Sequence, residues 1–287
     1  MIYDEVLSFY QESISGEGQR IEYLHQHINT ALSFLAGIES SRAYRLAKKY
    51  APESDFKELL KISIVLHDIG KVFYQNKRYN LRLDHEKGIC YLTFAGHEYI
   101  SAKIAYDFAF AFNEQYDNPY IDVVTFAVLH HHHAMGGKKN RVENLRKKLQ
   151  SMTQSEYIEC LDKLRLILNQ LLTDYKSVLE KTLANLGSSP IALVDPAVHQ
   201  KIYEKFVHTK KPNHRKLAFL LLDSLITCDY LAAEDRGGGV SHFHWTVHEF
   251  YNYWLRPEAS DRSEVLPPKM LNEDVNRQYT VRRVGER

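Results

Sequence analysis

Apolar residues recur at helical spacing along most of the chain. Leu24, Ile28, Ala31 and Leu35, for example, place one apolar face on a helix. The sequence predicts two short helices, one within residues 1–24 and one around residues 199–206. Longer helices are expected over residues 20–49, 53–66, 97–112, 155–184 and 213–234. Strands and helices do not alternate in this pattern, which therefore predicts an all-α fold and argues against a sheet-based nucleotide-binding fold.

The helix expected over residues 155–184 has the most regular pattern. Its apolar residues follow one another at alternating steps of three and four, as in a coiled coil. This row consists of Leu161, Leu164, Leu168, Leu171, Tyr175 and Val178. We expect the helix to pack on its neighbours, and an arm that binds a partner is the alternative. Residues 150–190 would then be a helical insertion in a single domain that spans residues 1–255.

Three stretches do not fit the helical pattern. Residues 72–96 are rich in Tyr, Asn and Arg and contain His85, which indicates an exposed polar loop or, alternatively, a loop that contacts substrate. Residues 240–255 gather aromatic side chains and are expected to form a packing helix or a strand-like cover. The last stretch, residues 256–287, is charged and contains proline, which is typical of a poorly ordered tail.

Composition narrows the class of function only a little. With 44% hydrophobic and 25% charged residues, the 287-residue chain has the composition of a soluble globular protein. Its formal net charge of +1 provides no global basic field, although local basic patches and metal ions can still bind nucleic acid. Cys90, Cys160 and Cys228 are too scattered for a zinc motif or a disulfide framework. Because no signal peptide and no apolar run of about 18 residues is evident, we expect a cytoplasmic protein without a membrane anchor.

The most informative stretch is K-I-S-I-V-L-H-D-I-G-K over residues 61–71. Its apolar run brings His67 and Asp68 side by side and then turns at Gly70. Neighbouring residues on a helix point about 100° apart, so these two side chains do not share one helical face. They can still reach one metal ion, or a close pair of ions, where other helices bring further histidines to the helix end. The alternative is a capping or salt-bridging Asp beside a core His.

Histidine is the compositional outlier, with 15 residues, and it is the commonest metal ligand in proteins. His27 lies one turn before Ala31 on an apolar face, which favours it over His25 as a ligand. His97 stands at the start of a helix whose small residues allow close helix packing. Residues 130–133 are consecutive histidines, and at most two adjacent ones among them can serve as ligands to one site.

Two carboxylates, Asp223 and Asp229, lie within the apolar helix over residues 213–234. Burying a carboxylate without a partner costs several kcal/mol, so an Asp in such a helix needs a cation. Asp229 is the better placed, one turn from Leu225 on the apolar face. Imidazole and carboxylate ligands together suit Mn, Fe, Co, Ni or Zn. The whole set is too large for one ion, but it fits two ions about 4 Å apart that share a carboxylate, as in phosphodiester cleavage.

The order His … His-Asp … His … His-His … Asp resembles the HD superfamily of metal-dependent phosphohydrolases, which are all-α. No P-loop and no G-x-S-x-G motif points elsewhere. Over about residues 20–255 the chain is similar to the stand-alone HD nuclease subunit of CRISPR type I interference. The segments that carry this resemblance are H-D-I-G-K (67–71), G-H-E-Y-I-S-A (96–102), H-H-H-A-M (131–135) and C-D-Y-L-A-A-E-D-R (228–236).

The resemblance implies two divalent metal ions, for which Mn, Mg, Ni, Co and Fe are all compatible. It assigns the side chains in two sets that share Asp68 as a bridge: His27, His67, Asp68 and Asp229 for one ion, and His97, His131 and His132 for the other. His131 and His132 are preferred over His130 because Ala134 and Met135 follow them as in the family. Lys71 would lie near the scissile phosphate and act with Asp68 in catalysis.

The resemblance further implies a nuclease that hydrolyses phosphodiester bonds of single-stranded DNA, and also of RNA or R-loop strands, with a water activated by the two ions. Its partners would be a separate helicase subunit and a CRISPR RNA-guided surveillance complex. The basic residues 138–148 are a candidate contact for the nucleic-acid backbone, and a solvated helix face is the alternative interpretation. Two other functions stay open: an HD phosphohydrolase of nucleotides or cyclic dinucleotides, and a non-catalytic HD scaffold.

Overall fold

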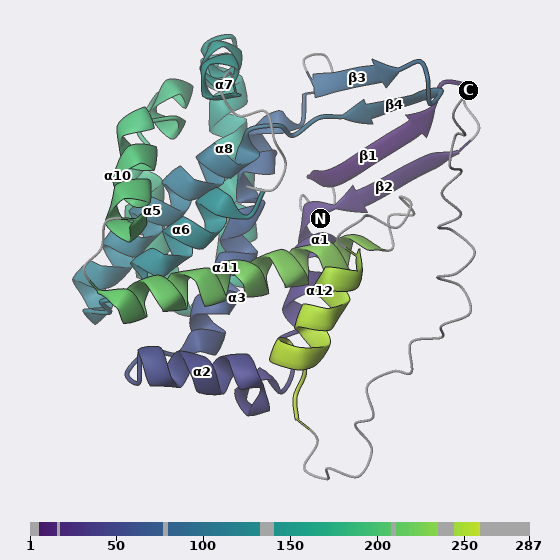
Figure 1. The fold of residues 1–287 in the computed structure, drawn as a ribbon. Coiled ribbons are helices and arrows are strands. Elements are labelled where there is room, and N and C mark those ends of the chain that lie inside the picture. The colour runs from purple at the N-terminus through teal and green to yellow at the C-terminus, as the bar shows by residue number, and fades with distance from the viewer. Residues whose placement is uncertain are drawn as a thin grey trace, which may run out of the picture. The chain divides into compact units, whose positions relative to one another are not determined.

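Helices make up most of the computed structural model of this protein, which describes residues 6–15, 18–76, 80–132, 141–207, 211–234 and 244–258 (Figure 1). The α-helices are α1 (Leu24–Ser33), α2 (Arg42–Tyr50), α3 (Phe56–His67), α5 (His97–Tyr116), α6 (Asp122–His130), α7 (Arg141–Gln150), α8 (Gln154–Leu171), α9 (Lys176–Asn185), α10 (Pro196–Val207), α11 (Pro212–Ala233) and α12 (His244–Phe250). Short 3₁₀ segments are η2 (Ile38–Ser40), η3 (Ile69–Tyr74), η5 (Thr173–Tyr175) and η6 (Pro190–Leu193), and a π-helical segment, η8 (Tyr251–Leu255), follows α12. The predicted all-α class is confirmed by this helical content.

Helices α3, α5, α6 and α11 form the centre of the helical body. α3 and α6 are apolar and buried on nearly every side, so they need cover all round. That cover comes from α5 and α11 on both helices, from α1 and α2 on α3, and from α10 on α6. Asp55 begins α3 by accepting a hydrogen bond from the backbone N–H of Lys57 at 3.0 Å. The helix ends at His67, where Asp68 leaves the helical path with φ −106° and ψ 0°.

The N-terminal residues form strands, so the prediction of a short helix within residues 1–24 is wrong. β1 (Leu7–Ser13) pairs antiparallel with both β2 (Gln19–Tyr23) and β4 (Ile89–Leu92), and β3 (Leu81–Asp84) completes the order β2-β1-β4-β3. Ser8 and Tyr10 are buried while their neighbours are less so, which is the period of two of a strand. The helix was expected because Val6, Phe9 and Tyr10 have helical spacing, but so short a stretch does not distinguish a helix from a strand.

Residues 72–96, expected to be irregular, contain η3, β3 and β4. β4 is held by β1, where Gln11 lies opposite Tyr91. This pairing joins segments far apart in the chain, so the local pattern of apolar residues could not predict it. His85 is exposed on the turn between β3 and β4, as expected for a polar loop residue.

Two long helices expected from the sequence are each divided in the structure. Residues 20–49 contain β2, α1, η2 and α2, with a turn at Gly37, whose φ of 72° favours glycine. Residues 155–184 contain α8, η5 and α9, because Leu172 has the non-helical angles φ −122° and ψ 50°. Leu164, Leu168 and Val178 are buried in the core. The apolar row therefore belongs to two helices of the core, and the single coiled-coil helix is wrong.

The described C-terminal region contains α12 and η8, in agreement with the packing-helix alternative for residues 240–255. The chain divides into one unit over Met1–Pro257 and a second over Glu258–Arg287. Of the poorly ordered tail predicted over residues 256–287, residues 259–287 lie outside the described residues. None of the described helices has both the length and the apolar character needed to cross a bilayer.

Candidate metal centre

The predicted ligands meet in the interior of the helical body, where the ends of α3, α5 and α6 approach α1 and α11. Each side chain has a defined place in these elements. His67 is the last residue of α3 and Asp68 follows it, His97 is the first residue of α5, His131 and His132 follow the end of α6, His27 lies in α1, and Asp229 lies in α11. All seven residues are buried except His132, which is half-buried.

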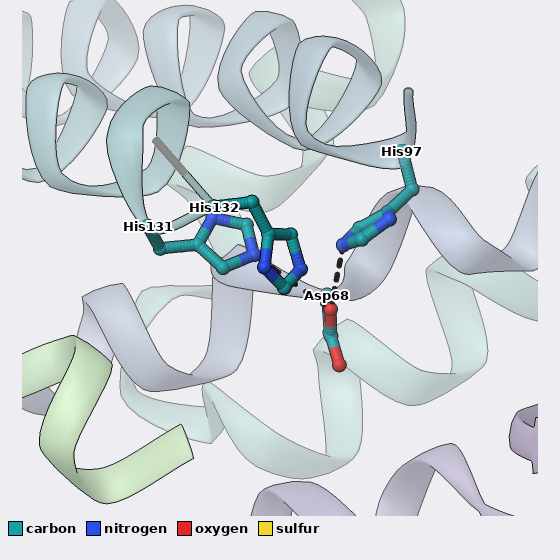
Figure 2. Close-up of side chains that lie close together, drawn as sticks. All are labelled: Asp68, His97, His131 and His132. Atoms are coloured by element: carbon teal, nitrogen blue, oxygen red, sulfur yellow. Dashed lines mark ion pairs between the residues drawn. The ribbon is translucent and has the colours of Figure 1, made fainter. Parts of the chain in front are cut away.

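One group consists of Asp68, His97, His131 and His132, whose candidate ligand atoms all lie within 4.8 Å of one another. Figure 2 shows the imidazoles of His97, His131 and His132 gathered around the Asp68 carboxylate. Nε2 of His97 lies 2.8 Å from Oδ1 of Asp68, and Nε2 of His131 lies 3.9 Å from the same oxygen. The four candidate ligand atoms are thus close enough together for one ion to contact all of them.

A second group consists of His27, His67, Asp68 and Asp229, again within 4.8 Å of one another. Oδ1 of Asp229 lies 3.0 Å from Nε2 of His27 and 3.4 Å from Nε2 of His67. The other oxygen of Asp68, Oδ2, lies 3.5 Å from Nε2 of His27 and 3.4 Å from Nε2 of His67. Asp68 thus turns Oδ1 towards one group and Oδ2 towards the other, which is the geometry of a bridging carboxylate.

Three of the histidines are oriented by the same local contact. Nδ1 of His67, His97 and His131 donates a hydrogen bond to the backbone carbonyl three residues earlier, at 2.6, 2.7 and 2.6 Å respectively. A carbonyl can only accept, so Nδ1 carries a proton, and in the neutral imidazole Nε2 therefore keeps its lone pair. Nε2 of His67 and of His131 is buried and forms no hydrogen bond. A buried acceptor without a donor is costly, and a cation would satisfy it. The donor set therefore fits divalent metal ions.

The ionisation of these groups also fits metal binding. Burial alone would raise the pKa of Asp68, but Lys71 and the nearby imidazoles outweigh it and hold this pKa well below its usual range. His27 and His67 likewise hold the pKa of Asp229 well below its usual range, against the effect of burial. Burial and neighbouring imidazoles lower the pKa of His131 strongly and that of His132 to about 4. At neutral pH the carboxylates are ionised and both of these imidazoles are neutral, which is the state that binds metal.

Lys71 lies at the edge of this centre. Its Nζ donates to Oδ2 of Asp68 at 2.5 Å and stands 5.4 Å from the ring centroid of Phe94. The side chain is 6% exposed, so its ammonium acts in surroundings of low polarity. The structure thus places Lys71 against the shared carboxylate, and its contact with a phosphate remains a prediction.

The structure keeps the other candidate side chains out of both groups. His25 stacks on Tyr23 with ring centroids 6.0 Å apart, and His130 packs on Phe126 at 4.6 Å. Asp223 is exposed on α11. His133, together with Ala134 and Met135, lies outside the described residues.

Two features near the centre were missed from the sequence. Glu22 in β2 lies 3.5 Å from Nδ1 of His27 and accepts a hydrogen bond from Ser8. Its carboxylate can orient His27 as the backbone carbonyls orient the other histidines. No local signal marks Glu22, because its place depends on the pairing of β1 with β2. The second feature is the contact of Gly70 with α5, where its N–H donates to Oγ of Ser101 at 2.9 Å.

Comparison with known proteins identifies part of the chain. Residues 39–169 match the family model of the HD domain. This segment includes His67, Asp68, His97, His131 and His132, whereas His27 and Asp229 lie outside it. Neither the curated proteins nor the solved structures contain a match to the chain.

Proposed function

We propose that this protein, which carries an HD domain and is on that evidence a metal-dependent phosphohydrolase, is a nuclease that hydrolyses phosphodiester bonds of single-stranded DNA. The observation that carries the proposal is the division of the Asp68 carboxylate between the two ligand groups. Two divalent ions in such an arrangement lower the pKa of water and neutralise charge on the attacking and leaving oxygens of a phosphodiester.

The chain's own residues prepare this chemistry. The backbone carbonyls fix three imidazoles with Nε2 directed inward, so little reorganisation is needed when ions bind. The burial of Asp68 and Lys71 keeps water away from most of the centre and strengthens its electrostatic interactions. Within this proposal Lys71 neutralises charge that develops on the phosphate.

A pocket of about 430 Å³ beside the metal centre supports a polynucleotide substrate over a mononucleotide. It is open to solvent and carries two cationic side chains, Arg82 from β3 and Lys148 from α7, with no carboxylate among its lining residues. Nζ of Lys148 stands 3.2 Å from the ring centroid of Tyr74. The complete lining is Tyr74, Asn80, Arg82, Thr93, Ala95, Asn144, Leu145, Lys148 and Ser151.

The segment that leads into α5 contacts both this pocket and the metal centre. Thr93 and Ala95 line the pocket, while the carbonyl of Phe94 between them accepts the hydrogen bond from His97. The ring of Phe94 faces Lys71. A strand with its scissile phosphate at the metals could therefore place a neighbouring nucleotide in the pocket, with its phosphate at Arg82 and Lys148.

Lys148→Gln is expected to weaken the binding of a single-stranded oligonucleotide and to reduce the slope of log K against log salt by about 0.7, the value for one lost contact on single strands. Fluorescence anisotropy in EDTA would measure this without cleavage. Lys147→Gln is the matched control, because Lys147 is an exposed neighbour on α7 that pairs with Glu143 at 3.2 Å. Equal effects of the two substitutions would place the strand elsewhere.

The same pocket predicts a pH dependence of binding. Burial, with a smaller effect of Arg82, lowers the pKa of Lys148 to about 7. Its ammonium is therefore present below pH 7 and lost above it in the free protein. Since a phosphate favours the charged form, affinity is expected to fall as pH rises through 7. Lys148→Arg, which stays charged throughout, should bind with a flat profile over the same range.

The proposed activity is tested with labelled single-stranded DNA, duplex DNA and RNA, and with a panel of nucleotides and cyclic dinucleotides. Each substrate is incubated with Mn²⁺, Mg²⁺, Ni²⁺, Co²⁺ or EDTA. Metal-dependent cleavage of single strands supports the nuclease. Turnover of nucleotides with all polymers intact would instead assign the centre to a small-molecule phosphohydrolase, and metal binding without any turnover would favour a scaffold.

We further propose that the nuclease acts with a separate helicase subunit and a CRISPR RNA-guided surveillance complex. The support is the sequence resemblance carried by H-D-I-G-K at residues 67–71 and G-H-E-Y-I-S-A at residues 96–102. An R-loop substrate tests it. Its displaced strand should be degraded faster when both partners are added than with the nuclease alone, and an unchanged rate would contradict the assignment.

A further inference from the structure

A third group of metal-suited side chains lies at the junction of α11 and α12, apart from the two groups already described. Glu234 caps the end of α11, His244 begins α12, and His248 follows one turn later on the same helix. Their candidate ligand atoms all lie within 4.8 Å of one another. Glu234 stands five residues after Asp229 on α11, which places the two carboxylates on different sides of that helix.

The contacts within this group converge on one oxygen. Nδ1 of His244 lies 2.8 Å and Nε2 of His248 lies 2.6 Å from Oε1 of Glu234. The two imidazole rings are 4.4 Å apart, centroid to centroid. If both imidazoles were protonated to pair with the single carboxylate, two like charges would stand side by side at that distance. One divalent cation bound by two neutral imidazoles and the carboxylate removes this repulsion.

The spacing and exposure of the residues favour a transition metal ion. Histidines four residues apart on one helical face are a recurrent zinc-binding arrangement, and a carboxylate from another element is a usual third ligand. The side chains of Glu234, His244 and His248 are 35%, 30% and 37% exposed. An ion can therefore enter from solvent and complete its coordination with water. Oxygen-preferring ions such as Mg²⁺ or Ca²⁺ are poorly matched by a site with two imidazoles.

We propose that Glu234, His244 and His248 bind a divalent transition metal ion, most naturally Zn²⁺, that joins the end of α11 to the start of α12. The role is structural, because the ligands come from both sides of the connection and the ion would close it. α12 packs on α11, and η8 continues from it to the buried Leu255. Holding α12 in place would thus stabilise the packing around the helix that carries Asp229. This site does not depend on the nuclease assignment.

Metal stoichiometry of the full chain tests the proposal. The protein is stripped with a chelator, dialysed against Zn²⁺ and analysed by inductively coupled plasma mass spectrometry, in an Asp68→Asn background that reduces binding at the other two groups. We expect the His244→Gln/His248→Gln double variant to bind one zinc equivalent fewer than its parent. His85→Gln is the matched control, because His85 is an exposed histidine outside all three groups.

Two further measurements keep the test independent of folding and of activity. Substitution with Co²⁺ should give visible absorption bands in the parent that are lost in the double variant and in Glu234→Gln. Zn²⁺ should also raise the Tm of the parent and of His85→Gln, and this rise should be smaller in the double variant. Unchanged zinc content, cobalt spectrum and Tm response in the double variant would overturn the proposal and leave only an ion-paired polar cluster.

Discussion

Asp68→Asn is expected to reduce metal-dependent cleavage by about 10³-fold or more, the loss typical of a residue on which a catalytic unit depends. Asparagine keeps the size of the side chain but removes its charge, and its amide nitrogen cannot act as a ligand. The two groups would no longer share a carboxylate, because only one of its two oxygens would remain, and the buried ammonium of Lys71 would lose its anionic partner. Initial rates on a labelled single strand with saturating Mn²⁺ measure the effect on cleavage, and metal analysis measures the effect on binding.

Two other carboxylates, both on α11, serve as comparisons that separate the effect of Asp68 from that of removing any carboxylate. Asp229→Asn removes a ligand from only one group, so it should lower the metal content less than Asp68→Asn does. Asp223→Asn changes an exposed carboxylate on the same helix and should leave both rate and metal content near those of the parent. An Asp68→Asn protein that retains a tenth or more of the parental rate would rule out a bridging role for this residue.

Gly70→Ala is expected to destabilise the fold by about 2–4 kcal/mol and to impair metal binding. A Cβ at Gly70 would lie 2.4 Å from the carbonyl oxygen of His97 and 2.9 Å from Oγ of Ser101. The first of these atoms is backbone, so it cannot rotate away, and the start of α5 must shift to make room. His97 is the first residue of α5 and would move with it. Thermal unfolding should show Tm lowered by roughly 5–15 °C.

Gly88→Ala provides the comparison for this prediction. Gly88 has φ of 62°, which costs an alanine about 1 kcal/mol, but a Cβ there meets nothing within 4 Å. The change should therefore be mild and should leave metal content intact. If Gly70→Ala proved no more destabilising than Gly88→Ala, the close approach of η3 to α5 would not be the reason for glycine at position 70.

The convergence of the candidate ligands was predictable because these residues carry chemical and positional signals. His67 and Asp68 end an apolar helix, and His97 begins the next one, so their approach follows from helix packing. The choice of His27 over His25 followed from helical spacing, and the structure brings His27 into one of the groups. The division of the two Asp68 oxygens between the groups could not be read from the sequence, because it depends on the path of the backbone after α3.

The sheet and the helix boundaries could not be predicted from the sequence, because both depend on contacts between segments that are distant in the chain. β1 is stabilised by β4 through pairs such as Gln11 with Tyr91, and such distant partners leave no periodic trace in either segment. In residues 155–184 the apolar spacing continues through Leu172, so the pattern alone gives no sign of the break. The break comes from tertiary packing, which turns α9 against α5. Such packing outweighs local propensity.

The contacts of His67 and His131 with the carbonyls of Ile64 and Val128 have a consequence for the helices themselves. These carbonyls belong to the last turns of α3 and α6, where no further helical N–H follows to bond them. Each of these two histidines therefore caps the C-terminus of its own helix with one nitrogen while it presents the other to the centre. Loss of such a side chain would fray a core helix even in metal-free protein, so the proposed metal binding and the integrity of two helices depend on the same two rings.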